Sequence, residues 1–205
     1  MEAVFVVNKN VNMDENRIEK ILEFLKEIDK FKTVYRTALT TSGSFEDDAG
    51  HTWHMCMYAL LLQNELKIDV NLQKVFEMVL VHDLVEIYAG DTPAFDHNGR
   101  NGKKEREIQA AEKLFNILPD DLKTKIDSLW GEYEESKTPE AKFVKAIDRL
   151  QGFAQNNFTD GKLWKQLNIK EDEIRNYNLK TINFYPELVQ IFEILFKKSK
   201  DKKDF

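Results

Sequence analysis

Residues 79–91 read VLVHDLVEIYAGD, and this stretch places two polar side chains inside an apolar run. His82 and Asp83 are flanked by VLV before them and LV after them, and both flanks are typical of buried helix. A buried imidazole or carboxylate costs free energy unless it is paired or bound to a metal ion. The pair is therefore either a core histidine satisfied by a carboxylate or part of a metal site.

Two more acidic residues follow within nine positions of His82. Glu86 lies at +4 from His82 and +3 from Asp83, so on a helix the three side chains project toward overlapping sides. Asp91 comes directly after Gly90, a residue that favours a helix end. The sequence thus predicts that four polar groups converge near one helix end.

Outward from this stretch, the apolar residues recur at helical spacing and few residues interrupt them. Glycine and proline together make up 12 of the 205 residues, which favours long helices over a many-turned sandwich or barrel. Asp14, Asp69 or Asn71, and Thr138 followed by Pro139 are the residues best suited to begin helices. The predicted helices cover about 14–28, 47–66, from 69 or 71 to the stop at Gly90, 103–117, 121–135, 139–155, 171–180 and 186–198.

The predicted fold is all-α, a single globular domain over residues 1–205 of about eight helices. Only residues 3–7 read as a possible strand, His97 is expected in a loop, and the last nine residues, KKSKDKKDF, are expected to be solvated and frayed. Residues 98–106, NGRNGKKER, are either a solvated charged surface or a mobile loop over an anionic ligand.

Composition excludes several classes of protein. Hydrophobic residues make up 42% and charged residues 32%, which is enough apolar material for one core. The net charge of −6 argues against a nucleic-acid polymer as partner, and no apolar run reaches the roughly 18 residues that span a bilayer. Cys56 alone cannot build an all-cysteine zinc site. With no secretory signal at the first ten residues, we expect a cytoplasmic protein with no membrane partner.

Two further places supply lone polar residues on apolar helices. His51 opens the helix that begins GHTWHM, and Asp148 shares an apolar stripe with Val144 and Ile147. Side chains from three separate helices can meet at one point in a bundle. A histidine, a His-Asp pair and an aspartate form a mixed nitrogen and oxygen set that suits Mn, Fe, Co, Ni or Zn and leaves positions for water and substrate.

The order His51, His82-Asp83, Asp148 resembles the H…HD…D signature of the HD-domain metal-dependent phosphohydrolase superfamily. The finer resemblance is to its 5′-deoxynucleotidase-like branch. It is carried by a stretch ending in arginine (31–36), the histidine helix HTW (51–53), HDLVE followed by GDTP (82–93), and TPEA followed by KAID (138–148). These motifs span about 31–150, so the resemblance implies an HD-domain core there, with the helices of 170–198 packed on it.

The resemblance implies a role for each matching residue. His51, His82, Asp83 and Asp148 would bind one divalent metal ion, of which Mn, Co, Fe, Ni, Zn and Mg are the candidates. Glu86 would orient or activate the attacking water, and Asp91 would assist as general acid or base. Arg36 would hold the substrate phosphate, since a guanidinium matches phosphate geometry. The implied activity is hydrolysis of the 5′-phosphate of deoxynucleoside monophosphates, with a small nucleotide as partner.

The chain departs from the family pattern beside the first histidine. Gly50 stands where glutamate is often found and loosens the expected helix start, while His54 stands where arginine or another residue is usual. His54 lies one turn from His51. We expect it either to lie outside the metal ligands and contact them, or to lie on the helix surface, in preference to serving as a fifth ligand. We expect Trp53, Trp130 and Trp164 to pack in the core or at an interface rather than to stack on bases.

Two alternatives to this function remain. One is an enzyme that acts on another phosphoester, such as a cyclic dinucleotide or an alarmone, although the Gly-Tyr-Pro element of the cyclic-dinucleotide group is missing from the sequence. The other is a non-catalytic nucleotide-binding module whose metal is structural. The family resemblance also implies a homodimer, for which the aromatic residues Phe184, Tyr185, Phe192 and Phe196 offer either an interface or buried core.

Overall fold

The computed structural model describes residues 14–96 and 98–205. The predicted strand at 3–7 and the predicted loop residue His97 lie outside the described residues. The elements, in chain order, are α1 (Glu15–Ile28), the 3-10 helix η1 (Asp29–Thr33), β1 (Tyr35–Leu39), β2 (Phe45–Asp47), α2 (Asp48–Glu65), α3 (Leu72–Val81), α4 (Glu86–Ala89), α5 (Lys103–Phe115), α6 (Asp120–Glu135), α7 (Pro139–Phe158), α8 (Lys162–Gln166), α9 (Glu171–Ile182) and α10 (Pro186–Lys202).

The mostly α-helical prediction is confirmed, and the local reasons for it are visible at the helix starts. The side chains of Asp14, Asn71 and Thr138 each accept a hydrogen bond from the backbone N–H three residues on, which caps α1, α3 and α7. Pro139 occupies the first turn of α7, where its missing N–H removes no helical bond. Among the described residues, no helix is long and apolar enough to cross a membrane.

The helix expected to run on to Gly90 is instead broken, and that part of the prediction is wrong. α3 ends at Val81 and α4 begins at Glu86. In a continuous helix the carbonyl of Val79 would accept from the N–H of residue 83. Here it accepts from Nδ1 of His82 at 2.7 Å, and the chain tightens into bonds of shorter span, such as Glu86 N–H to the Asp83 carbonyl at 2.9 Å.

A small antiparallel sheet was not predicted. β1 and β2 pair with Tyr35 opposite Asp47 and Leu39 opposite Phe45. The connecting turn includes Gly43 at φ +90°, a backbone conformation that glycine adopts without strain. Strands of five and three residues offer too little alternation for their pattern to stand out in a sequence.

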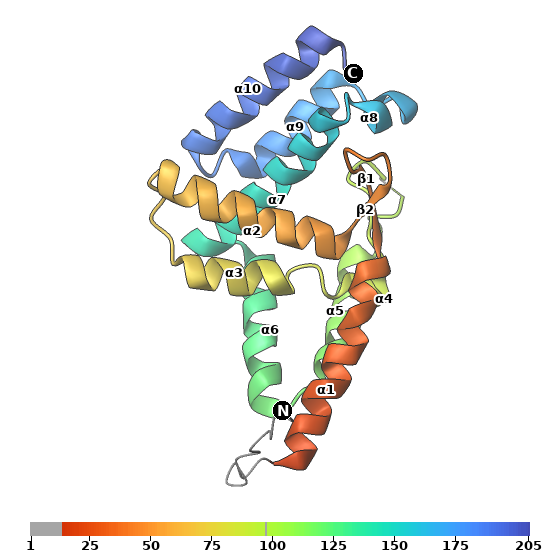
Figure 1. Cartoon of the computed structure of the whole chain (residues 1–205), viewed down its shortest axis with the longest axis vertical. Helices are drawn as coiled ribbons and strands as arrows, with labels where there is room; N and C mark the ends of the chain where they lie inside the picture. Colours follow the sequence, from red (N-terminus) through yellow and green to blue (C-terminus); the bar gives the residue numbers. More distant parts are fainter. Residues whose placement is uncertain (1–13, 97) are drawn as a thin grey trace, which may run out of the picture.

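The helices enclose two apolar clusters that meet near the break after α3. α7 contacts α2, α3, α6, α9 and α10, and it runs through the middle of the molecule in Figure 1. Val79 belongs to the cluster around α7, whereas Val81, Leu84 and Val85 belong to the cluster that they form with residues of α1, α5 and α6. The polar pair His82 and Asp83 therefore sits where the two clusters join.

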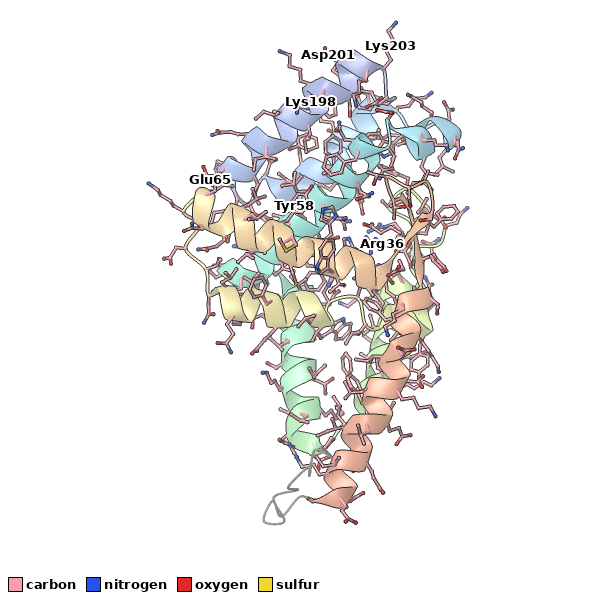
Figure 2. The ribbon with its side chains drawn as sticks, in the orientation of Figure 1. Arg36, Tyr58, Glu65, Lys198, Asp201 and Lys203 are labelled. Atoms are coloured by element: carbon pink, nitrogen blue, oxygen red, sulfur yellow. The ribbon has the colours of Figure 1, made fainter. Side chains whose placement is uncertain are left out.

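The C-terminal end is helical and packed at its last residues, so the prediction that it is frayed is wrong, whereas six of the last nine residues are exposed as predicted. α10 continues to Lys202, Asp204 is fully buried, and the ring of Phe205 lies 5.2 Å from that of Phe196. Figure 2 shows Lys198, Asp201 and Lys203 at this end of the molecule. Phe192 and Phe196 are buried within the chain itself, which removes them from any subunit interface.

Candidate metal centre and adjoining pocket

Two buried histidines present one ring nitrogen each to the same space. His51 lies in the first turn of α2 and His82 at the end of α3, and their ring centroids are 5.7 Å apart. Nδ1 of His51 lies 2.6 Å from Oε1 of Gln151, and Nδ1 of His82 lies 2.7 Å from the Val79 carbonyl. Since both Nδ1 atoms donate to these oxygens, each Nε2 carries a lone pair that a metal ion can take.

Neither Nε2 atom has a hydrogen-bond partner, although both are buried. Oδ2 of Asp83 lies 3.0 Å from Nε2 of His82 and 3.9 Å from Nε2 of His51, and Oδ1 of Asp148 lies 3.3 Å from Nε2 of His51. The donor atoms of His51, His82 and Asp83 all lie within 4.8 Å of one another. The structure thus brings three of the four residues expected to bind metal into one group and places Asp148 beside it, next to His51, and unsatisfied imidazole nitrogens beside carboxylates fit a divalent ion.

The protonation of these groups also suits a metal site. Burial lowers the pKa of His51 to about 4, so its imidazole is neutral, as a ligand must be. Burial opposes ionisation of Asp83 and Asp148, yet neighbouring cations dominate and hold the pKa of each below its usual range. Charged His82 lowers that of Asp83, and Arg149 lowers that of Asp148. Both carboxylates are therefore charged at neutral pH. Burial opposes the charge of His82, but Asp83 outweighs it and raises the pKa of His82, so His82 would have to lose this proton to bind a metal ion.

A second acidic group adjoins the first and includes a residue that sequence reasoning missed. Carboxylate oxygens of Asp48, Asp83 and Glu86 lie within 4.8 Å of one another. Burial and the nearby carboxylates raise the pKa of Asp48 to about 7 and raise that of Glu86 well above its usual value. Asp48 precedes His51 by three positions, a helical spacing that could have indicated it, but two aspartates at a helix start are usually interpreted as capping residues.

Arg36 enters this acidic cluster from β1. Its Nη1 lies 3.0 Å from Oδ2 of Asp83 and 3.2 Å from Oδ1 of Asp48, and its Nη2 lies 3.9 Å from Oδ1 of Asp148. Although burial opposes its charge, these carboxylates raise the pKa of Arg36 well above its usual value. The guanidinium therefore remains charged at the wall of the pocket.

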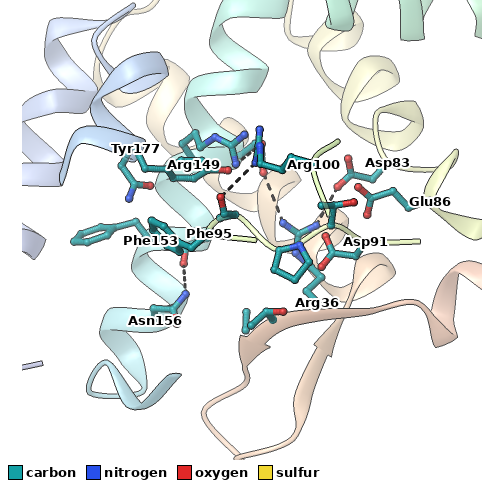
Figure 3. Close-up of a pocket in the computed structure, with 18 of the residues that line it drawn as sticks. Arg36, Asp83, Glu86, Asp91, Phe95, Arg100, Arg149, Phe153, Asn156 and Tyr177 are labelled. Carbon is teal, nitrogen blue, oxygen red and sulfur yellow. Dashed lines mark hydrogen bonds and ion pairs between the residues drawn. The ribbon is translucent and has the colours of Figure 1, made fainter. Parts of the chain in front are cut away.

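A pocket opens beside the acidic cluster, and Asp91, the last of the predicted site residues, lies in its wall. Asp91 follows Gly90, whose φ of +76° turns the chain at the end of α4, and it lines the pocket with Arg36, Asp83 and Glu86 (Figure 3). Burial raises the pKa of Asp91 above its usual range, which favours its protonated form more than in water.

Gln151 connects the two histidines of α2, and it too was missed. Its Oε1 accepts from His51, while its Nε2 donates to Oε1 of Glu46 at 2.9 Å and lies 3.1 Å from Nδ1 of His54. His54 therefore acts on the site through Gln151 and is outside the group of close donor atoms. Gly50 donates its N–H to Asp47 at 2.7 Å, so the helix start is capped rather than loosened.

The basic segment at 98–106 forms part of the pocket wall. Lys103, the first residue of α5, places Nζ 3.4 Å from Oε1 of Glu86 and 3.0 Å from Oε1 of Glu107. Arg100 also lines the pocket, and Arg106 donates to the carbonyls of Gly99 and Asn101 at 2.7 and 2.8 Å. Most of this segment is exposed, as a solvated charged surface would be, and Arg100 and Lys103 are its two residues that line the pocket.

Comparisons with known proteins agree with this geometry. The family model described as HD domain matches residues 28–188. A 5′-deoxynucleotidase of Xenopus laevis is 30% identical over 183 residues, 87% of each chain, and one of Danio rerio is 34% identical over 140 residues, 67% of this chain and 68% of the other. A crystal structure from Magnetospirillum magnetotacticum, described as a predicted metal-dependent phosphohydrolase, is 34% identical with a TM-score of 0.84, covering 93% of this chain and 96% of that one.

Proposed function

The chain belongs to the HD-domain family of metal-dependent phosphohydrolases, and from that premise we propose that it hydrolyses the 5′-phosphate of deoxynucleoside monophosphates to nucleoside and phosphate. The observation that carries the proposal is the pair of unsatisfied, buried Nε2 atoms of His51 and His82 beside two carboxylates at the wall of a pocket. Relatives that are 30–34% identical and named 5′-deoxynucleotidase supply the substrate class.

In this proposal His51, His82, Asp83 and Asp148 hold one divalent ion, of Mn, Co, Fe, Ni, Zn or Mg. When bound, such an ion neutralises charge on the phosphoryl oxygens and makes nearby water more acidic. The donor set is mixed in nitrogen and oxygen, so availability as much as affinity decides which ion is used.

The chain's own residues divide the remaining work. Arg36 donates to phosphoryl oxygens with a planar, permanently charged group. Glu86, whose raised pKa makes it a stronger base than an exposed glutamate, accepts a proton from the attacking water. Asp91, with its raised pKa, gives a proton to the departing 5′ oxygen of the sugar. Lys103 lies close enough to Glu86 to hold that carboxylate in place.

The decisive experiment is a phosphate-release panel over deoxynucleoside and nucleoside monophosphates with each divalent ion, together with elemental analysis of the protein. We expect release from the deoxynucleotides, and we expect Glu86→Ala to lose at least about 100-fold in kcat with metal content unchanged, since general acid–base catalysis contributes 10²–10⁴-fold. Glu105→Gln, at an exposed position on α5, is the matched control. Unchanged turnover in Glu86→Ala would indicate a structural metal and overturn the proposal.

We further propose that the chain works as a single HD domain, in the cytoplasm, and as a homodimer. Of the C-terminal aromatic residues, Phe192 and Phe196 are buried and only Phe184 is exposed, at 40%. Support for a dimer comes instead from α2, where Trp53, Leu60 and Leu61 are 66%, 45% and 62% exposed. Sedimentation at micromolar concentration tests this, because Trp53→Glu would convert a dimer to monomers.

A further inference from the structure

The end of the pocket away from the acidic cluster has a different chemistry. Tyr177 of α9 lies against Arg149 of α7, with the guanidinium carbon 4.5 Å from the ring centroid. The ring of Phe95 lies 5.1 Å from that of Tyr177, and Arg100 approaches the same ring at 5.9 Å. Figure 3 shows Tyr177, Arg149 and Phe95 on one side of the pocket, opposite Asp83, Glu86 and Asp91, with Arg100 between the two groups. Flat aromatic and guanidinium surfaces are the groups on which nucleobases stack.

A polar atom at the same end has no partner within the chain. Asn156 donates Nδ2 to the Gly152 carbonyl at 3.0 Å, but its Oδ1 is buried and accepts no hydrogen bond. A buried acceptor without a donor is unfavourable, and Asn156 lines the pocket beside Phe153 and Asn178. The amino or imino N–H group on the edge of a nucleobase is a donor that would satisfy it.

α7 joins the two ends of the pocket at a distance that suits a nucleotide. Asp148 faces the histidines, and Arg149, the next residue, stacks on Tyr177. Asn156 follows Asp148 by eight residues, which is roughly 12 Å along a helix. A phosphate at the acidic end would therefore leave the nucleoside beside Arg149, Tyr177 and Asn156.

Resting on the nucleotidase function proposed above, we propose that Arg149, Tyr177 and Asn156 form the nucleoside-binding subsite of this chain. The Tyr177–Arg149 stack holds the face of the base, and Oδ1 of Asn156 accepts from its edge. The subsite selects nucleotides over other phosphomonoesters, while the acidic end handles the phosphate that all of them share.

The test compares a substrate that has a base with one that lacks it. For wild type, Tyr177→Leu and Tyr177→Phe, kcat/KM is measured on the four deoxynucleoside monophosphates and on deoxyribose 5-phosphate. We expect Tyr177→Leu to lower kcat/KM roughly tenfold for the nucleotides and to leave deoxyribose 5-phosphate unchanged, since stacking on one aromatic side chain contributes a factor of this order. Tyr177→Phe keeps the ring and should restore the wild-type ratio.

Two further variants complete the design. Phe158 is an aromatic residue, 46% exposed, at the end of the same α7. Phe158→Leu should leave kcat/KM unchanged for both kinds of substrate and serves as the matched control. Asn156→Leu, of nearly equal size, should change the order of preference among the four bases. If Tyr177→Leu impairs both substrates equally, or neither, and Asn156→Leu leaves base preference intact, the subsite is wrong.

Failure of the subsite and failure of the nucleotidase proposal give different results. If wild type releases no phosphate from any deoxynucleotide, the activity is wrong, and calorimetry with the free deoxynucleosides decides the subsite instead. Binding to wild type that weakens roughly tenfold in Tyr177→Leu would support it, and binding that is absent or equal in both would overturn it.

Discussion

Both polar atoms of the Gln151 side-chain amide form hydrogen bonds beside the candidate metal centre. Its Oε1 accepts from His51, and its Nε2 donates toward Glu46 and His54. Because Glu46 and His54 take the N–H groups, the amide oxygen is left facing His51 and selects the tautomer in which Nε2 is free. A residue outside the proposed ligand set therefore fixes the His51 tautomer that metal binding requires.

We predict that Gln151→Leu lowers metal affinity by about 10- to 100-fold, the usual effect of removing a group that orients a ligating histidine. The change leaves His51 Nδ1 without an acceptor in a fully buried place. Metal affinity is measured by competition with a chelator, and Gln190→Leu, at an exposed position on α10, is the control. An unchanged affinity would show that Gln151 only fills space.

Residues of the candidate site could be predicted where a polar side chain interrupts an otherwise apolar helix, because that pattern is rare. His51, His82, Asp83 and Asp148 stand out together as polar residues on apolar helices, and the structure groups the first three, with Asp148 next to His51. Asp48 and Gln151 were missed for a physical reason. An aspartate near a helix start and a glutamine three residues after Asp148 have ordinary local explanations, and only the folded chain shows that they face the histidines.

At the scale of an element, the start of α2 links helix capping to the metal centre. Asp47 accepts from Gly50 N–H at 2.7 Å, and the turn that it caps carries both Asp48 and His51. Asp14 makes the same kind of cap on α1, which contributes none of the residues of the site. The two caps form a natural pair for separating stability from function.

We predict that Asp47→Ala and Asp14→Ala each lower the free energy of unfolding by about 1 kcal/mol. Only Asp47→Ala should also weaken metal binding, because the freed turn no longer holds His51 in place. Chemical denaturation of the chelated protein measures the first effect, and metal competition measures the second. Equal metal affinity in the two variants would mean that packing alone positions His51.

The elements themselves were predictable where a cap and an apolar stripe agree, as they do at Asp14, Asn71 and Thr138. The break between α3 and α4 was not, because it arises when the His82 side chain competes for the Val79 carbonyl. Periodicity describes where side chains point and carries no information about such a competition. β1 and β2 were missed because each strand is too short to show an alternating pattern. Their pairing, such as that of Tyr35 with Asp47, is a contact across the hairpin that local sequence does not reveal.

At the scale of the whole molecule, the C-terminal end connects to the pocket. Its composition, five lysines among nine residues, predicts solvation, yet Asp204 is buried and Phe205 lies 6.0 Å from Trp164, which itself lines the pocket. Packing of two aromatic rings outweighs the charges, which point outward along α10. The last residues thus support the wall that holds the proposed nucleoside subsite.

Gly161 is the position at which this support can be tested. It is the N-cap residue just before α8, at φ +60°, and a Cβ there would lie 2.0 Å from the backbone oxygen of Asp204. We predict that Gly161→Ala lowers the free energy of unfolding by at least about 1 kcal/mol, because an L side chain is strained in this conformation and the C-terminal residues must move away. Gly131→Ala, in the middle of α6 with open space around it, should instead raise stability by roughly 0.5–1 kcal/mol. Denaturant unfolding followed by tryptophan fluorescence measures both, since displacement of Phe205 also exposes Trp164. If Gly161→Ala were as stable as wild type with unchanged fluorescence, the C-terminal residues would not hold the pocket wall, and the subsite would depend on α7 and α9 alone.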